Sequence, residues 1–281
     1  MNINGKEIAE DIKNTLKERV AKLPRKPRLD IIYVGKNPII EGFLRIKRRT
    51  GEEIGAETNV HHFPSSVSQK SLIEEIRKIA ADENSDGMIV QLPLPEELDT
   101  ETILSAIPTE KDTDILSKKD LELFGNGKLS IAPPVAGAII EILKRNDISV
   151  TGKNAVVLGN GRLVGRPVSA WLKQNGAIVT VLDKTTAELT PFLQKADIIV
   201  SGTGNPGIIK SEMISQGVIL LDAGASEDAG EIKGDADYTC SDKCALFTPV
   251  PGGLGPITVA MLFKNLLERA EQKSNDSAAH S

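Results

Sequence analysis

Short apolar runs alternate with longer amphipathic stretches along most of the chain. The short runs are rich in β-branched residues, and most stop at glycine, proline or a turn cluster, which predicts strands. They lie at residues 28–34, 58–63, 87–92, 154–158, 177–182, 198–202 and 218–224. The longer stretches have apolar residues at helical spacing, which predicts helices at 39–54, 69–81, 136–145 and 166–175. Strands alternating with helices predict an α/β protein with parallel sheets.

Proline and glycine indicate where several of these elements end. Gly55 is placed to close the helix at 39–54, and Thr190 and Pro191 fit the N-cap and first position of another helix. The proline- and glycine-rich segment 248–258 excludes a helix interior or a central strand, and an apolar helical run follows at 259–267. Such a loop suits either a ligand held at a helix N-terminus or a tight connection between domains. We expect the polar tail at 271–281 to be frayed.

Size and charge narrow the class of protein. A chain of 281 residues predicts two domains, and its 40% hydrophobic and 26% charged residues are those of an ordinary soluble globular protein. A net charge of −5 gives no general attraction to nucleic acid or anionic membranes. No apolar run reaches the roughly 18 residues of a membrane span, and the polar first residues lack a signal-peptide core. We therefore expect a cytoplasmic protein without nucleic-acid or membrane partners.

Two cysteines, Cys240 and Cys244, lie four residues apart. With no second pair and no nearby histidine, their spacing does not support a zinc site. We expect two reduced thiols and no bound metal.

A glycine turn at residues 159–165 is the first candidate for a binding site. It lies between a predicted strand and a predicted helix, so Gly159 and Gly161 would let the backbone approach a pyrophosphate at the helix N-terminus. The spacing G-x-G-x-x-x-G is not the usual G-x-G-x-x-G, and a purely structural turn is the alternative. Asp183 ends the next strand, where an acidic residue binds the adenosine ribose of a dinucleotide.

Four further residues have the chemistry of a catalytic site but are ambiguous by themselves. Phe43 and Lys47 share one helix face, although a lone lysine is usually a solvated surface residue. Asp112 and Asp114 lie in a loop, where carboxylates often stabilise turns. Gln91 ends a buried strand, where ligands gather in open α/β sheets, although such an amide also commonly binds backbone.

Taken together, these positions resemble one family over nearly the whole chain: the bifunctional methylenetetrahydrofolate dehydrogenase/methenyltetrahydrofolate cyclohydrolases. The order and spacing of several motifs carry the resemblance. The most specific are Val90-Gln91-Leu92-Pro93-Leu94-Pro95, Lys111-Asp112-Thr113-Asp114, Val164-Gly165-Arg166-Pro167 and Pro251-Gly252-Gly253-Leu254-Gly255-Pro256, with Leu221-Asp222-Ala223-Gly224 and Gly234-Asp235-Ala236-Asp237 in support.

The resemblance implies a fold and a set of site residues. It implies an N-terminal α/β domain that binds folate (1–145 and 256–281) and a Rossmann-type cofactor domain (146–255). A C-terminal helix returns to the first domain, and members of the family are commonly homodimers. The implied catalytic residues are Lys47, Gln91 and Asp114. The implied substrate-binding residues are Phe43, Pro251, Gly252 and Gly253. The implied cofactor-binding residues are Gly159, Asn160, Gly161, Val164, Gly165, Asp183, Lys184 and Ala225.

The family's one-carbon chemistry suits these residue types. Hydride passes from methylenetetrahydrofolate to a nicotinamide, and water then attacks the methenyl cation that is left. A lysine beside a cation has its ammonium form disfavoured, so a neutral amine becomes available as a base. The resemblance requires no metal.

The chain also departs from the family pattern. Phe43 stands where the family usually has tyrosine, Ile40 where it has serine, and residues 133–138 keep only the first proline of a Pro-Cys-Thr-Pro-x-Gly segment. Gly159-Asn160-Gly161 replaces a Gly-Arg-Ser turn that suits the 2′-phosphate of NADP, and Asp183 would repel that phosphate. Lys184 could bind it instead, so the cofactor is expected to be NADP or NAD, with Asp183 favouring NAD.

Three functions stay open at this point. The first is oxidation of methylenetetrahydrofolate followed by hydrolysis of the methenyl product to formyltetrahydrofolate. The second is a diverged, non-catalytic folate- or nucleotide-binding paralogue, and the third is a monofunctional NAD-linked dehydrogenase. Lys47, Gln91 and Asp114 favour an enzyme, whereas Phe43 and the altered segment 133–138 favour a paralogue.

Overall fold

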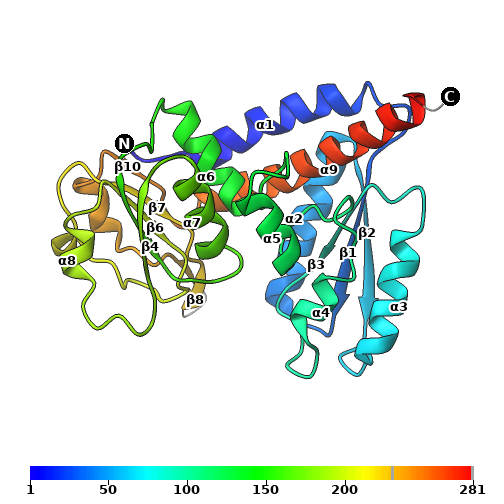
Figure 1. Ribbon diagram of the computed structural model, residues 1–281, viewed down its shortest axis with the longest axis horizontal. Coiled ribbons are helices and arrows are strands. Elements are labelled where there is room, and N and C mark those ends of the chain that lie inside the picture. The colour runs from blue at the N-terminus through cyan, green and yellow to red at the C-terminus, as the bar shows by residue number, and fades with distance from the viewer. Residues whose placement is uncertain (229–230, 280–281) are drawn as a thin grey trace. The chain divides into compact units, whose positions relative to one another are not determined.

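The computed structural model describes residues 1–228 and 231–279, and these residues form two compact units. The three-stranded unit comprises Glu10–Leu123, Ile131–Pro133 and the residues from Val259 onward. The five-stranded unit comprises Met1–Ala9, Phe124–Ser130 and Pro134–Thr258. The names refer to the parallel sheet of three or of five strands that each unit contains (Figure 1).

In the three-stranded unit, a parallel sheet has the order β2-β1-β3, with helices packed around it. Its strands are β1 (Arg28–Val34), β2 (Glu57–Phe63) and β3 (Gly87–Val90). The helices that contribute to this unit are α1 (Gly5–Val20), α2 (Pro38–Ile54), α3 (Gln69–Ala80), α4 (Thr100–Leu104), α5 (Lys118–Gly125) and α9 (Leu254–Ala279).

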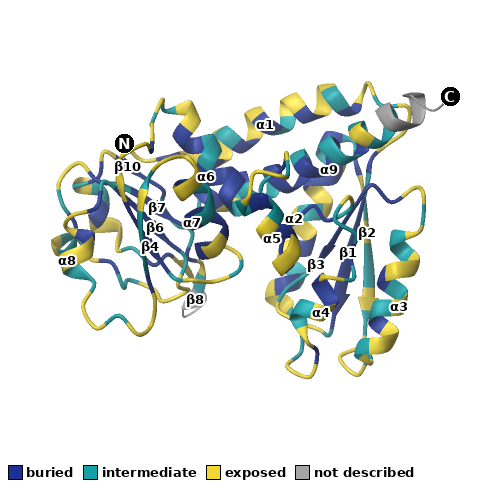
Figure 2. Ribbon diagram, in the orientation of Figure 1, coloured by how far each residue is buried: buried dark blue, intermediate teal, exposed yellow. Residues whose placement is uncertain are grey.

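Two strands of this sheet, the central β1 and the neighbouring β3, are buried along almost their whole length, as Figure 2 shows. Parallel strands covered by helices lose their alternation of apolar and polar residues, which explains the continuous apolar runs in the sequence. The chain then turns into α2 at Asn37, whose side chain accepts hydrogen bonds from the N–H groups of Ile39 and Ile40. Gly55 ends α2 in the left-handed conformation, as predicted.

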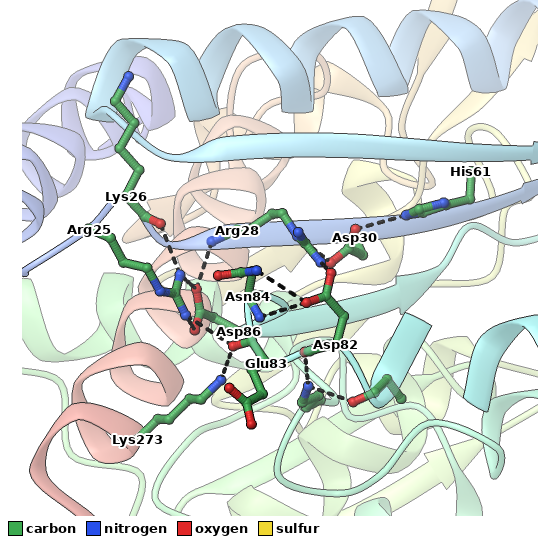
Figure 3. A network of polar contacts seen from close by, with 12 residues as sticks. Arg25, Lys26, Arg28, Asp30, His61, Asp82, Glu83, Asn84, Asp86 and Lys273 are labelled. Carbon is green, nitrogen blue, oxygen red and sulfur yellow. Dashed lines mark hydrogen bonds and ion pairs between the residues drawn. The ribbon is translucent and has the colours of Figure 1, made fainter. Parts of the chain in front are cut away.

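A network of charged side chains lies at the amino ends of β1 and β3 (Figure 3). Asp86 accepts two hydrogen bonds of 2.6 Å from the guanidinium of Arg25. Arg28 donates from Nε to the fully buried Asp30, which also contacts His61 at 2.8 Å. Because a buried carboxylate is costly without partners, this pairing lets Asp30 lie inside the sheet.

The five-stranded unit contains a second parallel sheet, with the order β10-β7-β6-β4-β5. Its strands are β4 (Asn154–Leu158), β5 (Ile178–Leu182), β6 (Ile198–Ser201), β7 (Ile219–Asp222) and β10 (Leu246–Phe247). The helices α6 (Pro134–Arg145), α7 (Gly165–Gln174) and α8 (Thr190–Leu193) accompany it, with an antiparallel pair formed by β8 (Ser226–Asp228) and β9 (Glu231–Lys233) and 3₁₀ turns at Ser211–Met213 and Tyr238–Asp242.

The predicted α/β class is confirmed, but two local predictions are wrong. Thr190 is the first residue of α8 rather than its N-cap, and the cap position is Leu189, whose carbonyl accepts from Phe192 and Leu193. The tail predicted to fray continues α9 as far as Ala279, while residues 280–281 lie outside the described part. This helix is held in the three-stranded unit by buried Leu266 and Leu267 and by an ion pair between Arg19 and Glu271.

No helix in residues 1–228 or 231–279 is long and apolar enough to cross a membrane.

Asp147 offers a test of the backbone conformation that ends α6. It has φ 54°, and the N–H groups of Asp147 and Ile148 return to the carbonyls of Lys144 and Leu143, which is a Schellman motif. Glycine adopts this conformation without a Cβ penalty, so we expect Asp147→Gly to raise the free energy of unfolding by about 0.5–1 kcal/mol. Asp147→Ala should lower it, and denaturant unfolding of both variants measures the difference. A glycine variant no more stable than the alanine variant would contradict the argument.

Candidate active site

Lys47 and Gln91 form a direct pair in the three-stranded unit. Lys47 lies on α2 and donates from Nζ to Oε1 of Gln91 at 2.6 Å. Gln91 follows β3, and its Nε2 donates to the carbonyl of Leu92 at 2.9 Å, which fixes the orientation of the amide. The two residues therefore meet at the carboxyl end of the sheet, where open α/β sheets bind ligands.

The loop that carries Asp114 pairs with the edge of β3 that does not face β1. The N–H of Met88 donates to the carbonyl of Lys111 at 2.7 Å, and the N–H of Thr113 donates to the carbonyl of Met88 at 3.2 Å. Asp112 then accepts from the N–H groups of Asp114 and Ile115 at 2.9 and 2.8 Å. These bonds fix the backbone on both sides of Asp114.

Burial governs the charges in this site. It lowers the pKa of Lys47, and the negative charge of Asp114 opposes that effect. It raises the pKa of Asp114, and the charge of Lys47 opposes that effect in turn. Across residues 1–228 and 231–279, no group donates a hydrogen bond to the Asp114 carboxylate, so it is available to a ligand.

Phe43 lies one helical turn before Lys47 on α2 and is 44% exposed. Its ring has no hydrogen-bonding group, so it offers the neighbourhood of Lys47 an apolar surface only. Of the residues predicted for the folate site, the structure joins Lys47 and Gln91 by a hydrogen bond. Asp114 interacts with Lys47 through its charge.

The predicted dinucleotide turn lies where the strand order of the five-stranded sheet reverses, between β4 and β6. Gly159 has φ 93°, and a Cβ built on it would come 2.8 Å from the carbonyl oxygen of Gly202, at the end of β6. A Cβ on Gly165 would come 2.0 Å from the carbonyl oxygen of Gly159. Both glycines are therefore required by close backbone approach, whereas Gly161 faces open space among the described atoms.

The helix after this turn presents its N-terminus without a side-chain cap. Val164 occupies the N-cap position of α7 and makes no side-chain hydrogen bond there. Within the described part of the chain, the N–H groups of Asn160, Gly161 and Gly165 make no hydrogen bond, and with the positive dipole end of this ten-residue helix they suit a phosphate.

Two buried carboxylates hold the loops at the same end of the sheet. Asp235 accepts from the N–H groups of Thr203 and Asn205 at 2.6 and 3.0 Å. Asp222 accepts from the N–H groups of Gly224 and Ala236 at 2.9 and 2.8 Å, and burial raises its pKa to about 6. These bonds fix the loops that follow β6 and β7, including the segment before the exposed Ala225.

Asp183 lies in the exposed turn after β5, beside the glycine turn. The N–H of Gly159 donates to the carbonyl of Leu182 at 2.7 Å. Oδ1 of Asp183 accepts from both the N–H and the hydroxyl of Thr185, which lowers the pKa of the carboxyl, and the charge of Lys184 contributes in the same direction. Asp183 is therefore ionised at neutral pH.

The loop of Pro251, Gly252 and Gly253 belongs to the five-stranded unit. Its Gly252 carbonyl accepts from the N–H of Gly5 at 2.9 Å, and a Cβ on Gly5 would come 1.7 Å from the Gly253 carbonyl oxygen. The loop is thus packed tightly on the first residues of the chain.

The cysteines have the properties of inert thiols. Both are buried, and burial raises the pKa of Cys240 to about 12 and that of Cys244 to about 11. Among the described residues, no group of three or more histidine, cysteine or acidic side chains is arranged to hold a metal ion.

Sequence reasoning missed two groups of residues that shape these sites. Asp222 and Asp235 were recognised only as motif positions, and nothing in their sequence indicates which N–H groups they bind. Asn265 was not singled out, although a polar residue among Phe263, Leu266 and Leu267 on a buried helix is a usable signal.

The fold and sites define an α/β protein with a Rossmann-type dinucleotide turn in one unit and a half-buried lysine paired with a glutamine in the other. Comparison with known families agrees in both parts of the chain. Residues 3–114 match the catalytic domain of tetrahydrofolate dehydrogenase/cyclohydrolase, and residues 133–274 match its NAD(P)-binding domain. The chain belongs to the tetrahydrofolate dehydrogenase/cyclohydrolase family.

Individual relatives support the same assignment. The chain is 35% identical to the bifunctional protein FolD of Staphylococcus aureus over an alignment of 270 residues, which covers 94% of each chain. It is similar to the crystal structure of FolD from Campylobacter jejuni, with a TM-score of 0.94, 33% identity and coverage of 97% and 99% of the two chains. It is also similar to the Trypanosoma brucei enzyme complexed with NADP cofactor and inhibitor, with a TM-score of 0.92, 32% identity and 97% coverage of each chain.

Asp112 provides a pH test of the loop that carries Asp114. Burial raises its pKa to about 8, and the charges of Asp114 and Asp120 add to the effect. The folded state therefore keeps a proton that the unfolded state has released above about pH 4, so this group makes stability fall as the pH rises towards 8. An asparagine side chain in its place would still accept both N–H groups without this cost.

We expect Asp112→Asn to gain about 1–3 kcal/mol in free energy of unfolding, relative to the original protein, between pH 5 and pH 8. Denaturant titrations at several pH values measure the gain. Two parallel stability curves would show that Asp112 is not protonated in the folded state.

Proposed function

We propose that the protein oxidises methylenetetrahydrofolate to methenyltetrahydrofolate with a nicotinamide cofactor, and then hydrolyses the methenyl product to formyltetrahydrofolate. The observation that carries the proposal is the 2.6 Å bond between Lys47 and Gln91, with the unbonded Asp114 carboxylate close enough to affect the pKa of Lys47. The family assignment supports the same pair of reactions.

The five-stranded unit fits a dinucleotide. Gly159 and Gly165 leave no room for side chains, and the uncapped N-terminus of α7 can receive the pyrophosphate. The nicotinamide supplies the hydride acceptor when it is bound. The relative from Trypanosoma brucei was solved with NADP, which supports a nicotinamide cofactor here.

Lys47 is the proposed base in the hydrolytic step. Water must lose a proton as it attacks the methenyl carbon, and only the neutral amine can accept that proton. Burial already lowers the pKa of Lys47, and a methenyl cation nearby would lower it further. The bond to Gln91 holds the amine in one place without adding a charge.

Asp114 is the proposed binding residue for the pterin. The pterin ring offers N–H donors, and an ionised carboxylate accepts two such bonds in parallel. Charge attraction from Lys47 keeps Asp114 more acidic than its burial alone would allow. The Lys47 ammonium thus supports the ionised form of Asp114, whereas the charge of Asp114 opposes the neutral amine that Lys47 needs as a base.

The proposal has four further parts. The loop of Pro251, Gly252 and Gly253 binds the substrate, the protein is a homodimer, and it is located in the cytoplasm. The folate-binding domain comprises 1–145 and 256–281, and the cofactor domain comprises 146–255. A non-catalytic paralogue is not favoured, since the relatives are named as bifunctional enzymes. A monofunctional dehydrogenase is the competing activity, because Phe43 cannot hydrogen-bond to Lys47.

A spectrophotometric assay with methylenetetrahydrofolate and each cofactor tests the proposal, provided that reduced cofactor and methenyltetrahydrofolate are followed separately. No reduced cofactor from folded protein at saturating substrate would contradict it. We expect Lys47→Met to lower methenyltetrahydrofolate hydrolysis by about 100-fold or more, because the base is lost, while folate still binds. Arg48→Met, an exposed neighbour on α2, is the control and should leave hydrolysis unchanged. Undiminished hydrolysis in Lys47→Met would remove Lys47 from the mechanism.

Asp183 is the proposed determinant of cofactor choice. Its ionised carboxylate can accept from the ribose hydroxyls of NAD and would repel the 2′-phosphate of NADP. Lys184, which follows it directly, would attract the same phosphate. We therefore propose that NAD is accepted at least as well as NADP.

The ratio of kcat/KM for the two cofactors decides between these residues. We expect Asp183→Ser to shift this ratio towards NADP by about ten-fold, because the like-charge repulsion is removed. Glu188→Ser, which removes an exposed acid further along the turn, should leave the ratio unchanged. If the original protein strongly prefers NADP and Asp183→Ser does not alter that preference, Lys184 governs the site instead.

A further inference from the structure

Helix α9 contacts the loop that carries Asp114 through a buried amide. Asn265 is 2% exposed, and its Nδ2 donates to the carbonyl of Thr113 at 2.9 Å and to the carbonyl of Ala132 at 2.8 Å. One turn further along, Arg269 donates from Nη2 to the carbonyl of Thr109 at 2.8 Å. Both α9 side chains thus bind backbone carbonyls of the segment that ends in Asp114.

Packing alone does not account for an asparagine at this position. Its neighbours Leu266 and Leu267 are buried, and an amide costs free energy in such surroundings unless its groups are hydrogen-bonded. Both Nδ2 hydrogens are used, and both acceptors are backbone carbonyls, which a leucine could not bind.

The contact is also tight. A Cβ on Gly87 of β3 would come 2.5 Å from Cγ2 of Thr113 and 2.8 Å from Cδ1 of Leu266. The loop and α9 therefore both lie directly on β3, and a small change in the helix would be transmitted to the loop.

We propose that Asn265 is a positioning residue for the folate site. By binding the carbonyl of Thr113, it fixes the peptide unit immediately before Asp114 and so holds that carboxylate where it can bind the pterin. The inference rests on the proposed function, in which Asp114 contacts the substrate. Asn265 itself acts only through the loop.

Steady-state kinetics of Asn265→Leu test the proposal. We expect the KM for methylenetetrahydrofolate to rise about ten-fold while the KM for the cofactor stays unchanged, since the glycine turn belongs to the other unit. Val20→Ala is the control: it removes buried apolar volume beside Gly55, away from the loop, and should leave both KM values unchanged. An unchanged folate KM in folded Asn265→Leu, or equal rises in both KM values, would overturn the proposal.

Asn265→Asp adds a readout that loss of packing cannot imitate. An ionised carboxylate would face two carbonyl oxygens, whereas the protonated acid can donate to one of them. The ratio of variant to original kcat/KM for folate should therefore rise as the pH falls from 8 to 6. The original protein's own pH profile measures the contribution of the charged groups around this loop, which both proteins contain: Lys47, Glu110, Asp112, Asp114, Asp120, Glu268 and Arg269. A ratio that does not change with pH would overturn the hydrogen-bonding role, also where Asn265→Leu fails to fold.

Amide hydrogen exchange separates this proposal from the proposed function. In Asn265→Leu or Asn265→Asp at pH 8, the N–H groups of Asp114 and Ile115 should exchange faster than in the original protein, while those of β1 should not. This result needs no turnover. An original protein that lacks folate activity would defeat the proposed function, whereas unchanged exchange at Asp114 and Ile115 would defeat the positioning role.

Discussion

The desolvated amine of Lys47 is the interaction on which the proposed chemistry depends. An ammonium group loses hydration when it is buried, so the fold must either pair it with a full charge or let its pKa fall. The direct partner is the neutral amide of Gln91, and the charge of Asp114 contributes without a hydrogen bond. Burial thus disfavours the ammonium form of Lys47, while the charge of Asp114 keeps the site attractive to a cation. Both properties suit a base that must act beside a cationic intermediate.

Both units use buried carboxylates to hold loops in place. Asp112 binds the N–H groups around Asp114, and Asp222 and Asp235 bind N–H groups in the loops after β6 and β7. Loops have no ladder of their own to satisfy their N–H groups, and a carboxyl group can accept several of them at once, whether ionised or protonated. The cost is burial of acidic groups, seen in the raised pKa values of Asp112 and Asp222. In exchange, these hydrogen bonds hold the loops at the carboxyl ends of the strands in one conformation.

The sequence predicted what depends on local pattern and on motifs. The apolar runs and glycines located the parallel strands, and Gly159 and Gly165 are held by the backbone contacts that such a turn requires. What it could not predict depends on contacts between distant segments. Asn265 lies 152 positions from Thr113, and no local pattern indicates which carbonyl its amide binds. The continuation of α9 to Ala279 was also missed, because the polar tail lacks a clear helical periodicity of apolar residues.

Ile115 shows how strongly the surrounding contacts determine this loop. It is β-branched and fully buried, yet its φ of 55° lies in the left-handed region that such residues rarely adopt. Local preference therefore opposes the observed backbone, and the opposing forces can be named: two N–H groups are bound by Asp112, and the Ile115 side chain is buried in the core. An unfavourable conformation persists only where its surroundings over-determine it. Here it lies beside the carboxylate proposed to bind the pterin, so the loop's contacts with β3 and α9 supply the stability that the local sequence lacks.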